Sequence, residues 1–306
     1  MSETSWISDF TVSGRDVRVK KTGAMVRVDR TVAGEAAVWL TLYLAVRTKA
    51  ALNSLRKPGP AVWFTPDPPR PWYLIWAAAA WNGVRIAKSP DEAAASFYFE
   101  DATAAPPPRA WHSRAFNFGC ADISKGRVAK VFEEVFGYPL ALDPTTGSGP
   151  CVEKGEANGV HDGRIVERPL KPRPGKVYQR LIDTVRDGEA IDLRTPFVAG
   201  RPVLVFIKRR PAHDRFANHN TRVGLARPED VFRPHEIERL TAFARAMQLD
   251  WGGLDVLRDR HTGRIYVVDV NKTDMPPLAL PFHQKIAAVA RLGRALRRMI
   301  EEETPR

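Results

Sequence analysis

The amino-acid sequence predicts a mixed α/β protein, with α+β character in its second half and more than one structural unit. The chain has 306 residues, which is longer than one typical domain. Between residues 61 and 101, short strand-like, helical and strand-like segments alternate, which is typical of a small parallel α/β unit. After residue 150 the strand-like segments come in hairpin-like pairs, which indicates antiparallel sheet.

The first long helix is expected at residues 35–55. The segment is mostly apolar, and Arg47 and Lys49 lie toward its C-terminal end, where the helix dipole favours basic residues. We expect an amphipathic helix that packs within the N-terminal part of the protein. A membrane-surface anchor is the alternative, which the thinly cationic polar face disfavours.

Residues 61–101 form the predicted small α/β unit. Its helix is expected at 72–81, because Pro71 suits a helix start and Asn82-Gly83 suits a helix end. The alanine- and proline-rich segment 102–108 then indicates a connecting loop. The predicted strands of the unit are 61–65, 84–87 and 96–99.

The remaining two thirds of the chain continue with helices and short strands, and no internal repeat is found. Helices are expected at 126–136, 234–247 and 281–303. Strands are expected at 150–154, 164–167, 176–182, 190–194, 201–209, 249–259 and 264–270.

The chain is strongly basic, with 47 lysines and arginines against 35 acidic residues and a net charge of +12. A surplus of this size favours anionic partners such as nucleotides, phosphorylated intermediates, nucleic acid or an acidic membrane face. The surplus is concentrated in residues 164–227, which carry 15 basic and 6 acidic residues. Arginine's planar fork suits phosphate oxygens, so an anion site is expected there, with a solvated basic face as the alternative.

The cellular context is expected to be cytoplasmic. Cys120 and Cys151 are the only two cysteines, too few for a disulfide scaffold, and they fit a reducing compartment. No apolar run has the length of a membrane span, and the first thirty residues do not resemble a signal peptide.

The most informative segment is 249–274, which contains three oxygen-bearing side chains in a suggestive pattern. Asp269 and Asn271 are two apart on one predicted strand and therefore share a face, and a hairpin would bring Asp255 beside them. Such oxygen ligands suit magnesium, which takes its remaining ligands from water and phosphates. Both aspartates lie in apolar runs, where a buried carboxylate is costly without a cation. A pair of solvent-facing aspartates near a turn is the alternative.

Two lysines are candidate phosphate ligands. Lys125 directly precedes a predicted helix, and Lys154 ends a predicted strand. The glycine-bearing segment 155–163 follows Lys154 and is a candidate flap over a ligand, with an ordinary hairpin loop as the alternative.

Taken in order, these segments resemble the ATP-grasp superfamily over roughly residues 113–280. The most specific part is the pairing of Gly-Leu-Asp-Val at 253–256 with Val-Asp-Val-Asn at 268–271. The other matching features, in chain order, are a small α/β lobe, Lys125, Lys154, the strand near 177–182, the Asp-Leu-Arg strand at 192–194 and the basic strand that ends at Arg209.

The resemblance implies an ATP-grasp fold, in which two α+β subdomains clasp a nucleotide behind a small pre-ATP-grasp α/β lobe. It implies an N-terminal extension and lobe at 1–112 and an ATP-grasp domain at 113–306. The two subdomains would be 113–178 and 179–306.

The resemblance also implies roles for individual residues, with ATP and Mg²⁺ (or Mn²⁺) as cofactors. The phosphate ligands would be Lys125 and Lys154, and the metal ligands Asp255, Asp269 and Asn271. The hinge that meets the adenine edge would be Gln179, Arg180 and Leu181, and Arg194 and Arg209 would face the γ-phosphate and the acyl-phosphate.

Two groups of residues depart from the family pattern or extend it. The hinge of the family commonly carries a glutamate where Arg180 stands, so Asp183 or Glu189 is expected to contact the ribose instead. For the substrate, the candidate contacts are Arg215, His219 and Arg222, in the loop that follows the basic strand.

The implied function is that of an ADP-forming, carboxylate–amine ligase-like enzyme. Its partners would be a small-molecule or peptide carboxylate and an amine or similar nucleophile, with no nucleic acid or membrane. Two alternatives stay open: a catalytically silent ATP-binding module and a basic nucleic-acid-binding protein. The tryptophans near residues 63–81 fall on apolar elements and predict core packing, which disfavours the nucleic-acid alternative.

Overall fold

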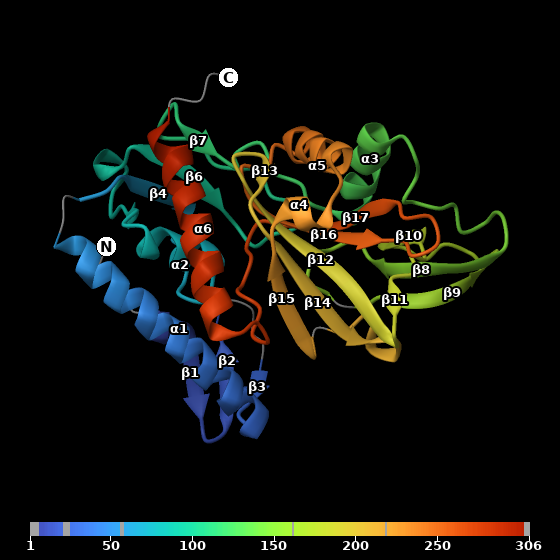
Figure 1. Cartoon of the computed structure of the whole chain (residues 1–306), viewed down its shortest axis with the longest axis horizontal. Helices are drawn as coiled ribbons and strands as arrows, with labels where there is room; N and C mark the ends of the chain where they lie inside the picture. Colours follow the sequence, from blue (N-terminus) through green and yellow to red (C-terminus); the bar gives the residue numbers. More distant parts are fainter. Residues whose placement is uncertain (1–5, 21–24, 56–57, 161, 218, 303–306) are drawn as a thin grey trace.

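The computed structural model describes residues 6–20, 25–55, 58–160, 162–217 and 219–302 (Figure 1). They form a mixed α/β structure with four sheets, which confirms the predicted fold class. None of the helices in this part of the chain is long and apolar enough to cross a membrane.

The N-terminal segment forms a small antiparallel meander that was not predicted from the sequence. A 3-10 helix at Trp6–Asp9 leads into β1 (Phe10–Ser13), β2 (Asp16–Val19) and β3 (Met25–Arg27), in the order β1-β2-β3. Arg70 pairs with Asp9 at 2.7 Å and so connects this segment to the lobe that follows. Strands of three or four residues carry too little pattern to be recognised in a single sequence.

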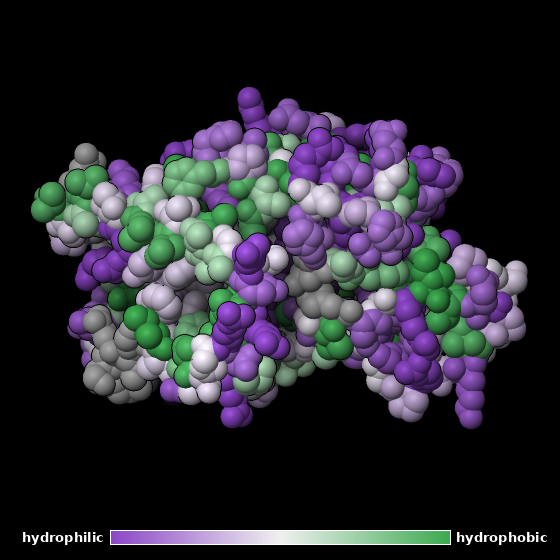
Figure 2. All heavy atoms as spheres, turned by 90° about the horizontal axis from the view of Figure 1, so that it is seen from below, coloured by the Kyte–Doolittle hydropathy of each residue, from purple (hydrophilic) through white to green (hydrophobic). Residues whose placement is uncertain are grey.

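The first long helix is α1 (Arg30–Ser54), which begins five residues before the predicted start. Asp29 caps it, since its carboxylate accepts a hydrogen bond of 2.8 Å from the backbone nitrogen of Val32. The predicted amphipathic pattern is wrong, because apolar residues lie on both faces. Leu42 and Val46 are buried, whereas the outward residues Val38, Leu40, Leu44 and Leu52 are exposed. In Figure 2, green apolar patches lie among white and purple residues on the left half of the molecule, the side on which α1 lies in Figure 1.

The small lobe is built on a parallel sheet of order β5-β4-β6-β7, which confirms the predicted parallel unit. α2 (Leu74–Trp81) and α6 (Phe282–Glu301) pack on this sheet in one hydrophobic core, together with the buried residues of α1. The end of the chain therefore returns to the lobe (Figure 1). The strands are β4 (Ala61–Pro66), β5 (Arg85–Ile86), β6 (Ala95–Phe99) and β7 (Ala115–Phe116), and a 3-10 helix spans Pro90–Glu92.

The largest sheet is antiparallel and has the order β15-β14-β12-β16-β17, with β11 and β13 also paired to β12. One face packs against α3 (Lys125–Phe136) and α5 (Pro234–Ala246) in a second hydrophobic core. The strands are β11 (Val185–Arg186), β12 (Glu189–Val198), β13 (Arg201–Pro202), β14 (Val205–Pro211), β15 (Arg222–Ala226), β16 (Trp251–Arg258) and β17 (Ile265–Asn271); the short helices are Ala212–Asp214 and α4 (Pro228–Val231).

The third sheet holds the predicted flap hairpin. It has the order β10-β8-β9 and is antiparallel throughout, with β8 (Gly149–Gly155), β9 (Arg164–Arg168) and β10 (Lys176–Arg180). It stands beside the large sheet in Figure 1. The predicted division of the chain near residue 112 stays a prediction, and α6 packs with the lobe although it lies beyond that point in sequence.

Candidate functional site

A cavity of about 590 Å³ lies on the face of the large sheet that α3 and α5 leave uncovered. Residues Arg194 of β12, Lys208 of β14 and Asp255 of β16 line its floor. Lys154, at the end of β8 in the neighbouring sheet, lines its wall. The cavity is thus bounded by two sheets whose cationic and anionic side chains converge.

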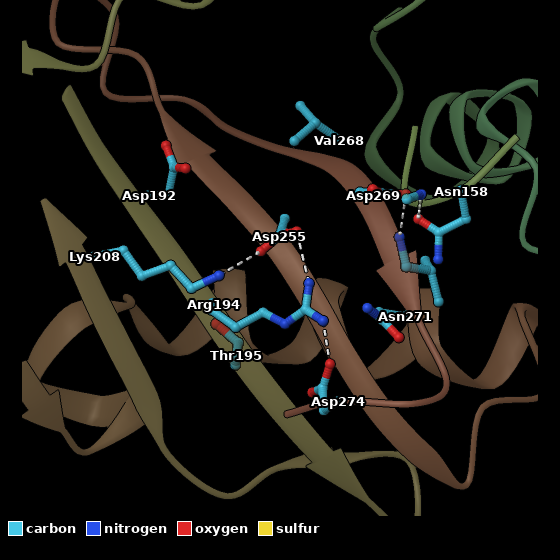
Figure 3. Close-up of polar contacts among 12 residues, drawn as sticks. Asn158, Asp192, Arg194, Thr195, Lys208, Asp255, Val268, Asp269, Asn271 and Asp274 are labelled. Atoms are coloured by element: carbon cyan, nitrogen blue, oxygen red, sulfur yellow. Dashed lines mark hydrogen bonds and ion pairs between the residues drawn. The ribbon is translucent and has the colours of Figure 1, made fainter. Parts of the chain in front are cut away.

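The three predicted metal ligands lie together on the floor of this cavity (Figure 3). Asp255 lies directly opposite Asp269 across the β16–β17 pair, and Asn271 lies opposite Gly253. The hairpin brings the three residues together because adjacent antiparallel strands set cross-strand neighbours face to face. Asn271 is held in place by Thr273, whose backbone nitrogen donates to the Asn271 Oδ1 at 2.8 Å.

Of the two aspartates in this set, Asp255 is the one whose pKa is lowered. Arg194 donates to its Oδ2 at 2.6 Å, and the Nζ of Lys208 lies 3.7 Å from its Oδ1. Burial raises the pKa of Asp255, but the charges of Arg194 and Lys208 outweigh it and lower this pKa to about 2. Its buried Oδ1 has no hydrogen-bond partner within the described residues.

This donor set fits magnesium, the ion that the predicted function requires. Within the described ranges, no three His, Cys, Asp or Glu side chains cluster closely enough to hold a metal by themselves. The set here is two carboxylates and one amide, Asp255, Asp269 and Asn271. Magnesium is typically bound through one or two carboxylates together with water and phosphate oxygens, so a nucleotide would complete its shell.

Arg194 is held by a second carboxylate that the sequence did not single out. Its guanidinium is ion-paired with Asp274 as well as with Asp255, and Asp274 is only 4% exposed. Burial lowers the pKa of Arg194, but the two carboxylates outweigh it and raise this pKa. Gly253 leaves room for the pair, because a Cβ there would lie 2.7 Å from the Arg194 Nε and closer still to Asp274. The sequence feature that could have identified Asp274 is its position three residues after the predicted ligand Asn271.

The two predicted phosphate lysines also reach this cavity. Lys125 donates to the carbonyl of Ala157 at 2.8 Å, and Lys154 donates to the carbonyl of Val268 at 3.1 Å. Burial lowers the pKa of Lys154 to about 8, and the charge of Asp269 opposes this shift. Asn158 and Gly159, in the predicted flap, line the cavity beside them.

The structure does not bring Arg209 to the cavity. Arg209 pairs with Glu189 at 3.8 Å, while its neighbour Lys208 lines the cavity near Asp255. Side chains alternate along a strand, so Arg194 and Lys208 share one face and Arg209 points to the other. Arg209 therefore lies away from the cavity where the phosphates were predicted, and its neighbour Lys208 lines that cavity.

The predicted hinge residues Gln179, Arg180 and Leu181 do not line the cavity either. Gln179 is buried, and its Nε2 has no hydrogen-bond partner in the described part of the chain. The carbonyl of Ile182, just beyond them, accepts a hydrogen bond of 3.0 Å from Arg215.

The residues expected to contact the ribose have partners of their own. Asp183 pairs with Arg260 at 2.7 Å, and its carboxylate lies 3.1 Å from His261. Glu189 pairs with Arg222 at 3.1 Å. Neither acid lines the cavity.

Of the predicted substrate contacts, only His219 lines the cavity, together with Asn220 and Phe216. Arg215 instead donates to the carbonyl of Ile182, and Arg222 donates to the carboxylate of Glu189, as described above. Arg210 holds their loop in place, because it pairs with Asp192 and donates to the carbonyl of Ala217 at 2.6 Å. Phe216 packs toward Gly163, where a Cβ would lie 3.0 Å from its ring.

Comparison with known proteins agrees with this architecture. No protein-family model and no curated protein matches the sequence. A structure of the ATP-grasp ligase PsnB complexed with minimal precursor, Mg and ADP superposes with a TM-score of 0.51 at 13% identity, covering 79% of this chain and 97% of that chain.

Two other solved structures are similar at lower TM-scores. The RimK domain protein ATP-grasp from Sphaerobacter thermophilus gives 0.47 at 12% identity, covering 79% of this chain and 100% of that chain. D-alanine–D-alanine ligase from Bacillus anthracis, complexed with ATP, gives 0.44 at 11% identity, covering 78% of this chain and 96% of that chain. A PsnB complex with a phosphomimetic precursor variant matches over 61% of this chain and 62% of its own.

The PsnB structure is that of an ATP-grasp ligase, and this chain has the ATP-grasp fold. This result confirms the resemblance inferred from the sequence and the predicted fold.

Proposed function

We propose that this protein is a magnesium- and ATP-dependent ligase that activates a carboxylate as an acyl-phosphate for attack by an amine or similar nucleophile. The observation that carries the proposal is the convergence of opposite charges on one cavity. Lys125 and Lys154 lie on its wall, and Asp255 and Asp269 lie on its floor with Arg194. A nucleotide triphosphate with its metal is the ligand whose charges match both sets.

The two lysines would hold the α- and β-phosphates of the nucleotide. Because the pKa of Lys154 is about 8, this lysine is still mostly protonated near neutral pH and can pair with phosphate oxygens. Asn158 and Gly159 of the flap would lie over the bound phosphates. The glycine has a positive φ of 74°, which suits a tight turn at the flap tip.

Asp255, Asp269 and Asn271 would hold one or two magnesium ions, with manganese as the alternative. When bound, the metal offsets the negative charge of the phosphates during transfer. Asp255 would then share its charge between the metal and Arg194, while Asp274 keeps the guanidinium in place.

In the first step the substrate carboxylate would attack the γ-phosphorus, and the bond to ADP would break. In the second step the nucleophile, as a neutral amine, would attack the acyl carbon, the bond from this carbon to the phosphate oxygen would break, and the amine proton would leave with the phosphate or to solvent. Arg194 and Lys208 line the cavity and would hold the oxygens of the transferred phosphoryl group. Their contribution would be electrostatic stabilisation and positioning, since fixed charges in a cavity shielded from water act strongly on developing charge.

The proposal is tested by measuring ADP release with panels of carboxylates and amines. We expect release to need magnesium, one acid and one nucleophile, and to fall at least 100-fold in Lys154→Met. Nucleotide binding with no release for any pair would instead favour the silent ATP-binding module. Absence of both, with salt-dependent binding to DNA or RNA, would favour the nucleic-acid alternative.

A further inference from the structure

The cavity has further lining residues that differ in chemistry from those described above. They are residues 275–279, which connect β17 to α6, and Glu35 of α1. We name these residues the acceptor mouth. Met275 is 62% exposed and Leu278 is 44% exposed, so apolar surface is open to a ligand here. The two prolines at 276 and 277 restrict the backbone of this segment.

In the described part of the chain, Glu35 differs from the other acidic residues of the cavity in having no cation beside it. Asp255 and Asp274 are paired with Arg194, and Asp162 is paired with Lys176. Burial raises the pKa of Asp269, and the charges of Lys125 and Lys154 oppose this shift. Among the described residues no lysine, arginine or histidine lies within 4.0 Å of the Glu35 carboxylate. Glu35 is also the only acidic residue of α1.

We propose that the acceptor mouth binds the second substrate as a protonated amine carried next to an apolar group, as at the N-terminus of an apolar amino acid or of a peptide that begins with one. Glu35 would pair with the ammonium group, and Met275 and Leu278 would contact the apolar side chain. The inference rests on the proposed function, because it places this amine beside the activated carboxylate. It concerns recognition only and assigns Glu35 no part in bond formation.

Charge complementarity is what selects this class of ligand. The other charged residues that line the cavity are balanced, with the cations Lys125, Lys154, Arg194 and Lys208 against the carboxylates Asp162, Asp255, Asp269 and Asp274. Among the described residues, Glu35 is therefore a carboxylate of the cavity that is neither paired with a cation nor assigned to the metal, and it attracts a cationic ligand. The adjoining apolar residues favour a ligand that also buries apolar surface.

The test is calorimetric titration of the whole chain with leucine amide, with and without magnesium and a non-hydrolysable ATP analogue. Leucine amide has the ammonium and the apolar side chain but no carboxylate. N-acetyl-leucine amide, which lacks the charge, serves as the ligand control. Glu238→Gln, on the exposed side of α5, serves as the charge-matched protein control.

We expect Glu35→Gln to weaken binding of leucine amide about tenfold or more, since hydrogen bonds to charged groups are among the stronger ones. Leu278→Ser should weaken it about fivefold through lost apolar contact. Glu238→Gln should bind as the wild type does, and N-acetyl-leucine amide should bind more weakly than leucine amide.

The two proposals fail in different ways. If the nucleotide binds but leucine amide does not, or if Glu35→Gln binds it as tightly as the wild type, this inference is overturned and the proposed function stands. If leucine amide binding depends on Glu35 but no nucleotide binds, the amine site is supported and the proposed function is overturned. Circular dichroism and the melting temperature of each variant confirm that α1 is intact.

Discussion

Arg194 and Asp255 lie directly opposite each other on β12 and β16, and the Nη1 of Arg194 donates to the Oδ2 of Asp255 at 2.6 Å. This pair places a fixed cation on a carboxylate that we propose as a metal ligand (Figure 3). A metal ion would compete with the guanidinium for that carboxylate. Asp274 keeps Arg194 in the cavity in either case, so the arginine stays available for phosphate oxygens.

The metal site can be tested through two of its ligands. Asp269→Ala and Asn271→Ala are each expected to abolish magnesium-dependent nucleotide binding, because each removes an oxygen ligand that no other side chain replaces. The fold should be retained, since both residues lie at the cavity and not in the two hydrophobic cores. Titration calorimetry measures the binding and circular dichroism the fold. Undiminished binding in both variants would remove the metal-site assignment.

Arg194 and Arg209 provide a matched comparison of two arginines on paired strands. Arg194→Ala should lower the rate of ADP release about 100- to 1000-fold, the usual effect of removing one charge-stabilising donor. Arg209→Ala should change the rate less than about threefold, because Arg209 faces away from the cavity and pairs with Glu189. Steady-state kinetics under saturating ATP distinguish the two. Equal losses in both variants would contradict the orientation of β14.

Gly253 is expected to be intolerant of a side chain. Gly253→Ala should destabilise the protein by about 1–3 kcal/mol, because its Cβ would overlap Arg194 and Asp274. Gly224→Ala in β15 is the control, since a Cβ there meets nothing within 4 Å, and it should change the free energy of unfolding by less than about 1 kcal/mol. Urea denaturation gives both values. A Gly253→Ala protein as stable as the Gly224→Ala protein would contradict the packing described.

Lys154 should make stability depend on pH in the alkaline range. Its pKa is about 8 in the folded protein, against an ordinary value of 10.5. Between these values the unfolded chain binds more protons than the folded protein, so the contribution of Lys154 to the free energy of unfolding rises with pH.

This contribution is measured as the difference between the wild type and Lys154→Met in urea denaturation at pH 8, 9 and 10. The wild type should gain stability relative to the variant, by at most about 1.4 kcal/mol per pH unit. Nucleotide affinity of the wild type should fall over the same range, because a neutral lysine no longer pairs with phosphate. A difference that does not vary with pH would show that Lys154 keeps its ordinary pKa.

The sequence was most informative where the relevant residues are close along the chain. Asp255, Asp269 and Asn271 belong to one hairpin, so local strand patterns were enough to bring them together. The parallel unit at 61–101 and the flap hairpin were predicted for the same reason. Local pattern determines a hairpin because its register depends on a short turn.

The features that the sequence did not predict depend on which residues of a strand face the cavity, or on contacts between distant parts of the chain. Lys208 and Arg209 are adjacent on β14, so their side chains point to opposite faces of the sheet. An error of one residue in the predicted strand pattern therefore assigns the wrong residue to the cavity. Glu35 lines the cavity from a helix more than 200 residues before the segment 275–279 that also lines it, and no local pattern predicts that the two come to one cavity. Asp274 depends on the path of the chain after β17, which only the fold shows.

The most direct test of the central claim is calorimetric titration of the purified protein with a non-hydrolysable ATP analogue, in the presence and absence of magnesium. We predict clear binding that requires magnesium, because the cavity presents phosphate-binding lysines beside a set of oxygen ligands. Lack of binding at every magnesium concentration would contradict the account and leave a basic scaffold with an ATP-grasp fold.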